Sequence, residues 1–189
     1  LDESFDSAYF GTSVIAVTPA AGGDARPLTG MLDRQALQPR WSADGRFLYF
    51  ALEEDRSVQL ARVPASGGEV ERLTARGQVV REIAIAPGGH VAVLVTNPAQ
   101  PAEVFALEGK TLRPLSRQND ALMAQLSLGA VADLDVQVPD GTRVGALTVT
   151  PPDFRAGKRY PTLLYIHGGP RAQDHHEFER MAYVFEANV

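Results

Sequence analysis

The stretch IAVTPAAGGD (residues 15–24) recurs as LARVPASGGE (residues 60–69), 45 positions further along the chain and without a gap. The match continues into a Leu-Thr pair at residues 28–29 and again at residues 73–74. Repeats of about 40–50 residues, made of short strands and glycine-rich turns, are typical of the blades of a β-propeller. The repeat therefore predicts antiparallel, four-stranded blades over the first part of the chain.

A second register of the repeat relates WSADGRF (residues 41–47) to IAPGGHV (residues 85–91). We interpret the Asp-Gly pair of the first and the Gly-Gly pair of the second as two-residue hairpin turns, because glycine adopts positive φ without a Cβ clash. Further strands are expected at residues 58–63 and 103–107. The chain holds about two and a half such units, fewer than the roughly 4–8 blades that usually close a ring.

Two groups of side chains stand out in this region. Four aromatic residues on a predicted strand indicate a blade interior, namely Trp41, Phe47, Tyr49 and Phe50. Residues 53–56, Glu-Glu-Asp-Arg, are interpreted as a solvated loop between strands. The alternative is that they line the inner mouth of a propeller and attract the amino terminus of a peptide.

The repeat is lost after about Ser116, where residues 117–120 form a polar connector. Three strands are predicted beyond it, at residues 131–138, 144–150 and 162–166. The turn sequence Pro-Asp-Gly-Thr joins the first two into a hairpin. The third is apolar on both faces, as a central strand covered by helices should be.

A helix is predicted over residues 175–187, because apolar side chains there fall three and four positions apart. Asp174 is well placed to cap its first turn.

Composition and charge exclude several classes of partner and of chemistry. The 189 residues are 44% hydrophobic, enough to bury one substantial core or two modest ones. The formal net charge is −5 and no basic run stands out, so nucleic acid is not expected as a partner. The absence of cysteine excludes disulfides, thiolate catalysis and cysteine-ligated zinc. The apolar runs are too short to cross a bilayer, so no membrane partner is expected either.

Residues 160–170 read YPTLLYIHGGP, a short apolar strand that ends in His167-Gly168-Gly169-Pro170. A glycine pair just past a buried strand leaves backbone N–H groups uncovered, where they can face a developing oxyanion. The motif therefore predicts half of an acyl-transfer site. The alternative is a tight strand-to-helix connection without chemistry.

A propeller-type repeat, a strand pair and then KRYPTLLYIHGGP (residues 158–170) resemble, in this order, the prolyl oligopeptidase family of serine peptidases. Within it the chain looks closest to the acylaminoacyl-peptidase and dipeptidyl-peptidase-like members. The resemblance implies a β-propeller over the active site of an α/β-hydrolase domain. Residues 1–118 would hold the last blades, and residues 119–189 the opening strands of the hydrolase domain. The implied activity is hydrolysis of short peptides through an acyl-enzyme, with the propeller restricting access.

By the same resemblance, the N–H of Gly169 would donate to the tetrahedral intermediate, while His167 and Gly168 would position this loop. Arg171 and Gln173 border the site, as candidate substrate contacts or as ordinary loop residues. The family's nucleophile motif, Gly-x-Ser-x-Gly, occurs nowhere in the 189 residues, so a Ser–Asp–His triad is absent from them. The resemblance thus implies a piece of an enzyme that is inactive by itself.

The remaining ionisable residues carry weaker signals. Residues 175–177, His-His-Glu, together with Glu179, invite comparison with a metal site, but two or three ligands without a second cluster make a poor one. A solvated helix start is favoured, and neither a metal nor a cofactor is expected. Asp6, Asp133 and Asp135 have no partner that the sequence assigns.

The rival interpretation is a non-catalytic propeller module that binds proteins or peptides. It is based on the turn at residues 41–45, which resembles the repeat of TolB-like proteins. For the peptidase, the expected partners are short peptides and the remainder of the hydrolase domain. The oligomeric state, with a homo-oligomer among the options, is left open. So is the compartment, which is cytoplasmic or, after removal of a signal peptide, periplasmic or secreted.

Overall fold

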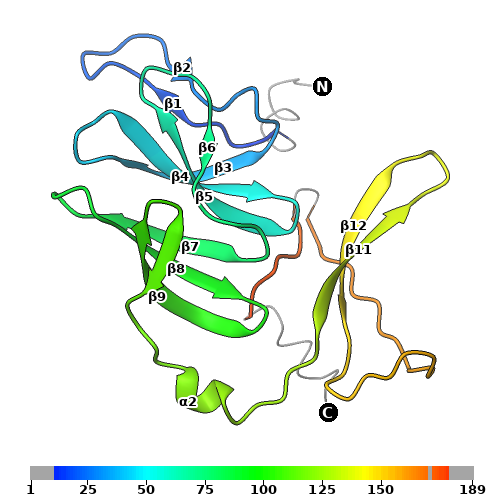
Figure 1. Ribbon diagram of the computed structural model, residues 1–189. Coiled ribbons are helices and arrows are strands. Elements are labelled where there is room, and N and C mark those ends of the chain that lie inside the picture. The colour runs from blue at the N-terminus through cyan, green and yellow to red at the C-terminus, as the bar shows by residue number, and fades with distance from the viewer. Residues whose placement is uncertain (1–10, 170–171, 179–189) are drawn as a thin grey trace.

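The computed structural model describes residues 11–169 and 172–178, and almost all of its regular structure is antiparallel β-sheet (Figure 1). The helix α2 (Asp120–Met123) is a single turn that begins at Asp120, the last residue of the predicted polar connector. Asp6, Arg171 and the predicted helix beyond residue 178 lie outside these ranges. No helix in the described part of the chain has the length and apolar character needed to cross a bilayer.

Two four-stranded meanders follow one another along the chain. The first consists of β3 (Gln35–Trp41), β4 (Phe47–Glu54), β5 (Ser57–Pro64) and β6 (Glu71–Arg72). The second consists of β7 (Val79–Ile85), β8 (Val91–Asn97), β9 (Gln100–Glu108) and β10 (Thr111–Pro114). A short pair, β1 (Ala16–Val17) and β2 (Arg26–Pro27), precedes them. The antiparallel organisation that the repeat predicted is confirmed, and the two meanders meet where β5 runs parallel to β7.

The 45-residue repeat is visible in equivalent hydrogen bonds. In the first unit the N–H of Ile15 donates to Thr29 Oγ1 over 2.9 Å. In the second the N–H of Leu60 donates to Thr74 Oγ1, also over 2.9 Å. Both threonine hydroxyls are buried, so each satisfies a backbone donor that water does not reach. The repeat therefore encodes a buried hydrogen bond from a backbone N–H to a threonine hydroxyl, as well as a strand pattern.

Thr74→Val is expected to lower the free energy of unfolding by about 1–2 kcal/mol, because the buried N–H of Leu60 would lose its acceptor. Thr74→Ser keeps the hydroxyl and is the matched control, with a smaller loss expected. Urea denaturation followed by circular dichroism measures both variants. Equal losses in the two variants would mean that the Thr74 hydroxyl contributes no more than its methyl group does, and would contradict the prediction.

A third unit has an equivalent hydrogen bond, in which a serine hydroxyl takes the place of the threonine hydroxyl. The N–H of Val104 donates to Ser116 Oγ over 2.8 Å, and the hydroxyl of Ser116 in turn donates to the carboxylate of Glu103. Glu103 Oε1 also accepts from the backbone N–H and the side-chain amide of Asn119, each over 2.9 Å. The Ser116 hydroxyl, followed by these Asn119 donors, holds the pKa of Glu103 below its ordinary value. The buried Glu103 thus holds the segment that follows β10 against β9, through its hydrogen bonds with Ser116 and Asn119.

The two-residue turn predicted at Asp44-Gly45 is wrong. Residues 42–46 form a longer loop, in which Ser42 Oγ accepts from the N–H of Phe47 over 2.9 Å and donates to Asp44 over 2.7 Å. The Ser42 hydrogen bond, together with those from Arg46, lowers the pKa of Asp44 to about 2. These side-chain bonds support a β-turn within the loop, in which the N–H of Gly45 donates to the carbonyl of Ser42 over 2.9 Å. The equivalent loop at residues 86–90 is closed between the N–H of Ala86 and the carbonyl of His90.

The two-residue turn lies instead at Asp55-Arg56, between β4 and β5. Both residues adopt positive φ, 49° and 61°, as a turn that matches the twist of its strands requires. The prediction of a solvated loop over residues 53–56 is therefore wrong. Glu53 and Glu54 belong to β4, and the side chains of Glu54 and Arg56 are buried.

The apolar core follows the meanders. One buried cluster centres on Phe50, Leu52 and Val63 of β4 and β5, and a second on Leu60, Val80 and Val93 where the meanders meet. Phe50 confirms the predicted blade-type interior, whereas Trp41 does not, because 53% of its surface is exposed. Trp41 stands at the end of β3, beyond the cover of the neighbouring loops.

A separate hairpin follows α2, as predicted. It consists of β11 (Val131–Gln137) and β12 (Arg143–Val149), and Figure 1 shows it standing apart from the two meanders. The N–H of Gly141 donates to the carbonyl of Val138 over 2.9 Å and closes the turn.

The predicted central strand at residues 162–166 is not formed in this structure. The segment is irregular, and Leu163, Leu164 and Ile166 are 83%, 84% and 76% exposed. A strand needs a neighbour for its N–H and C=O groups and cover for its two faces. None of the strands within residues 11–169 pairs with this segment.

The helix start predicted at residue 175 is also wrong, because residues 175–178 contain bends and no helical turn. The N–H of His176 donates to the carbonyl of Arg56 over 2.8 Å, and the N–H of Phe178 donates to Thr96 Oγ1 over 3.1 Å. These long-range hydrogen bonds hold residues 176–178 in a non-helical conformation against the β4–β5 turn and β8.

Candidate active site

The His-Gly-Gly loop lies at the surface. Gly168 and Gly169 are exposed, and His167 is half-buried with its Nδ1 3.2 Å from the carbonyl oxygen of Gly168. Gly169 has φ of +79°, a conformation in which a side chain would be strained. Open space surrounds the position that a Cβ on Gly168 would take. The loop is open to contact by another molecule or by further polypeptide, and the role of the Gly169 amide stays a prediction.

Residues 172–178, which we call the anchor segment, run between the two meanders and the β11–β12 hairpin (red in Figure 1). His175 Nε2 lies 3.0 Å from Glu53 Oε1, and His176 Nε2 lies 2.9 Å from Asp133 Oδ1. His176 and Glu177 are buried. The solvated surface predicted for these residues is therefore wrong, and they join separate parts of the fold.

Gln173, one of the two candidate substrate contacts, faces the β4–β5 turn. Its Oε1 accepts from the N–H of Arg56 over 3.1 Å, and its Nε2 donates to Glu53 Oε1 over 2.8 Å. Both ends of the side-chain amide thus have protein partners.

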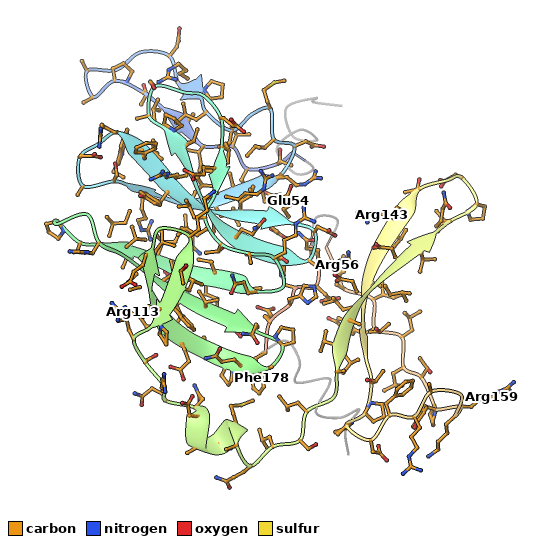
Figure 2. All side chains as sticks on the ribbon, viewed as in Figure 1. Glu54, Arg56, Arg113, Arg143, Arg159 and Phe178 are labelled. Carbon is orange, nitrogen blue, oxygen red and sulfur yellow. The ribbon has the colours of Figure 1, made fainter. Side chains whose placement is uncertain are left out.

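Arg56 joins the first meander to the hairpin, and Figure 2 shows it between them. Its Nη1 lies 3.1 Å from Asp135 Oδ1, and its Nε lies 3.3 Å from Asp133 Oδ1. Nη1 also donates to the carbonyl of Ala146 over 3.0 Å. These contacts supply the partners that the sequence did not assign to the two aspartates. A guanidinium with several donors suits such a junction, because one side chain reaches both strands of the hairpin.

Gly145 allows this approach. A Cβ at this position of β12 would lie 3.1 Å from Arg56 Nη1 and 3.2 Å from Cζ. Any side chain there would press against the guanidinium group.

A second charged group surrounds Glu54 at the end of β4. Arg72 donates to both of its carboxylate oxygens, over 2.7 Å and 2.9 Å. The hydrogen bonds from Arg72, helped by the charges of Arg76 and Arg34, lower the pKa of Glu54. Glu54 is therefore held as a carboxylate inside a cation-rich cluster.

The sequence missed this junction because its partners are far apart in the chain. Arg56 and Ala146 are 90 residues apart, and His175 and Glu53 are 122 apart. The only signal was the number of charged residues near position 55, which a solvated loop explains equally well.

Two further features concern metal binding and ligand binding. Within residues 11–169 and 172–178, no group of three or more His, Cys, Asp or Glu side chains is arranged to hold a metal ion. A cavity of about 350 Å³ lies between the meanders, and none of the predicted site residues lines it. Its lining includes Tyr49, Arg62, Glu71, His90 and Lys110.

The chain is similar in sequence to known peptidases, although no family model matches it. It is 22% identical to the uncharacterized peptidase YuxL of Bacillus subtilis over 143 residues, which cover 75% of this chain and 22% of YuxL. It is 24% identical to dipeptidyl-peptidase 5 of Porphyromonas gingivalis over 140 residues, which cover 70% of this chain and 19% of that protein. The chain thus spans about a fifth of the length of these relatives.

Solved structures show the same fold. An acylaminoacyl peptidase in complex with Z-Gly-Gly-Phe-chloromethyl ketone matches 82% of this chain and 24% of its own, with a TM-score of 0.71 and 20% identity. The acylaminoacyl peptidase of Pyrococcus horikoshii matches the same shares with a TM-score of 0.69. The similarity in sequence to peptidases and in fold to acylaminoacyl peptidases, together with the order of repeat, hairpin and His-Gly-Gly-Pro loop, supports the resemblance of this chain to a segment of a peptidase of the prolyl oligopeptidase family.

Proposed function

We propose that this chain is the part of a serine peptidase that joins the last blades of a β-propeller to the opening strands of an α/β-hydrolase domain. The parent would hydrolyse short peptides through an acyl-enzyme. The observation that carries the proposal is the exposed apolar run at residues 163–166, which leads directly into His-Gly-Gly-Pro. Consecutive apolar residues with so much exposed surface mark a place where further polypeptide packs.

In this proposal the run becomes a central strand once the remainder of the hydrolase domain pairs with it. The loop after it would then lie at the end of a strand, where an α/β hydrolase has its oxyanion hole. Two features support this arrangement, the exposure of Gly168 and Gly169 and the positive φ of Gly169.

The chemistry requires residues beyond those of this chain. A serine hydroxyl would attack the peptide carbonyl while a histidine accepts its proton, and the N–H of Gly169 would donate to the oxyanion that forms. The histidine would then protonate the leaving amine, and water would hydrolyse the acyl-enzyme. His167 and Gly168 would hold the loop in shape.

The two meanders would be propeller blades that stack against further blades. Each buries apolar side chains where it meets its neighbour, as the second cluster around Leu60, Val80 and Val93 does. A ring of such blades over the active site would admit short or unfolded peptides and exclude folded proteins.

The proposal is tested by comparing this chain with the product of the whole gene. The isolated chain is expected to show no labelling by a fluorophosphonate probe and no turnover of chromogenic short peptides. The whole-gene product is expected to show both. A gene that encodes a stop or an unrelated sequence after Val189, or a whole product that the probe does not label, would favour the rival binding module.

Gly169→Pro in the whole-gene product is expected to lower kcat by about 10²–10³-fold, because proline removes one oxyanion donor. Gly157→Pro is the matched control, since Gly157 has a similar φ of +84° and lies away from the loop. Steady-state kinetics on a chromogenic peptide measures both variants. An equal loss in the control would assign the effect to backbone strain.

A further inference from the structure

We infer that the β4–β5 turn of the first meander positions the Gly169 loop through the anchor segment. Glu53 and Gln173 would then be positioning residues of the peptidase rather than substrate contacts. The inference rests on the proposed function, and it adds a route by which the propeller side of the molecule acts on the reacting atoms. Two residues alone separate Gly169 from the anchor segment.

Gln173 carries the first part of the argument. Its amide oxygen accepts from the N–H of Arg56 over 3.1 Å, while its amide nitrogen donates to Glu53 Oε1 over 2.8 Å. A side-chain amide with its donor and its acceptor both directed at one turn is matched to that turn. A residue that bound substrate would present one of these groups to the substrate.

The backbone of the turn provides the second part. The N–H of Arg56 donates to Gln173, and its carbonyl accepts from the N–H of His176 over 2.8 Å. Turn residues of a two-residue hairpin lie outside the strand ladder, so both groups are available to another segment. Glu53 Oε1 adds a contact with His175 Nε2, 3.0 Å away. The turn therefore holds three residues of the anchor segment.

The far end of the segment is fixed by other parts of the fold. Glu177 pairs with Arg81 of β7 over 2.9 Å, and the N–H of Phe178 donates to Thr96 of β8 over 3.1 Å. His176 Nε2 lies 2.9 Å from Asp133 of the hairpin. A segment held by both meanders and by the hairpin has little freedom, and it restricts the loop that precedes it.

This restriction has a kinetic consequence. Misplacing a reacting or stabilising group by about 1 Å can cost on the order of 10²-fold in rate. If the turn positions Gly169, loosening the anchor segment lowers kcat. KM, which depends on the substrate-binding surfaces, stays near its original value.

The experiment compares three variants in two settings. Glu53→Ala removes the acceptor shared by Gln173 and His175. Gln173→Glu keeps the acceptor for the N–H of Arg56 but places a carboxylate against Glu53, which repels it. Glu53→Gln keeps an oxygen that can accept both bonds and is the matched control.

The first setting is this chain, in which hydrogen–deuterium exchange is followed at the amides of His176 and Phe178. Exchange is expected to be about 5-fold faster or more in Glu53→Ala and Gln173→Glu, and near the original rate in Glu53→Gln. Unchanged exchange in the first two variants would overturn the inference, whether or not the parent is a peptidase.

The second setting is the whole-gene product, assayed on a chromogenic short peptide. Glu53→Ala and Gln173→Glu are expected to lower kcat by about 10-fold at unchanged KM, with rescue in Glu53→Gln. A raised KM at unchanged kcat in Gln173→Glu would make Gln173 a substrate contact and overturn the inference. Unchanged kcat together with faster exchange would do the same. A wild-type product without activity would overturn the proposed function, and with it the catalytic part of the inference.

Discussion

Phe50→Ala is expected to lower the free energy of unfolding of this chain by about 3–5 kcal/mol, the largest loss among the stability variants proposed. Phe50 lies in the middle of β4 and has no exposed surface. It packs in the buried cluster with Leu48, Leu52 and Val63. Removing the ring loses its transfer free energy and leaves a cavity that the neighbouring strands, held by their ladders, cannot close.

Trp41→Ala is the matched control for the loss of an aromatic ring from the same meander. Because Trp41 is 53% exposed, its replacement is expected to cost about 1 kcal/mol or less. Urea denaturation of the three proteins, with the slope checked for constancy, gives the comparison. Similar costs for Phe50 and Trp41 would mean that the first cluster is not the core of the meander.

Glu103→Gln is expected to lower the free energy of unfolding by about 2 kcal/mol at pH 7, since hydrogen bonds to charged groups are worth about 1.5–3 kcal/mol. Glu103 is buried as a residue, with 1% of its surface exposed, and its carboxylate accepts from Ser116 and twice from Asn119. Glutamine keeps one acceptor oxygen but turns an amide group toward Ser116. The segment between β10 and α2 would lose the hydrogen bond from the Ser116 hydroxyl that holds it to Glu103 of β9.

The effect depends on pH in a defined direction. The hydrogen bonds lower the pKa of Glu103 in the folded chain below the ordinary value of 4.5, so the unfolded chain binds the proton first as the pH falls. The stabilisation is complete above pH 4.5 and is lost as the pH falls from there through the folded pKa. The difference between wild type and Glu103→Gln should shrink in the same range.

Glu108→Gln is the control for this carboxylate. Glu108 is on the same strand, but it is exposed and pairs with Arg113 over 2.6 Å at the surface. Its loss is expected to cost no more than about 1 kcal/mol. A pH-independent difference between wild type and Glu103→Gln would contradict the role given to the charge.

Much of the meander region could be predicted from the sequence, because each signal there is local or periodic. The Leu-Thr pairs of the repeat correspond to the same hydrogen bond in two units, made by Thr29 and Thr74. The β11–β12 hairpin followed from a turn sequence between two alternating runs. The turn at Asp55-Arg56 was missed because it lacks the glycine that usually marks a two-residue hairpin turn, whereas the Asp-Gly pair at 44–45 has one.

The candidate site divides in the same way. The His-Gly-Gly-Pro loop stood out as a motif, while the residues around it could not be found. Arg56, Asp133 and His176 meet only because the hairpin and the anchor segment fold back on the first meander. Their positions in the sequence carry no trace of that meeting.

By itself, the sequence determined the repeat, the antiparallel meanders, the hairpin and the motif at residues 167–170, because these depend on periodicity and on neighbours in the chain. Only the tertiary structure decided the backbone conformation of the described residues between 162 and 178. A strand at residues 162–166 needs a paired neighbour. At residues 176–178, the carbonyl of Arg56 and the hydroxyl of Thr96 accept from the N–H groups of His176 and Phe178, and the positions of these acceptors are set by strands folded from distant parts of the chain.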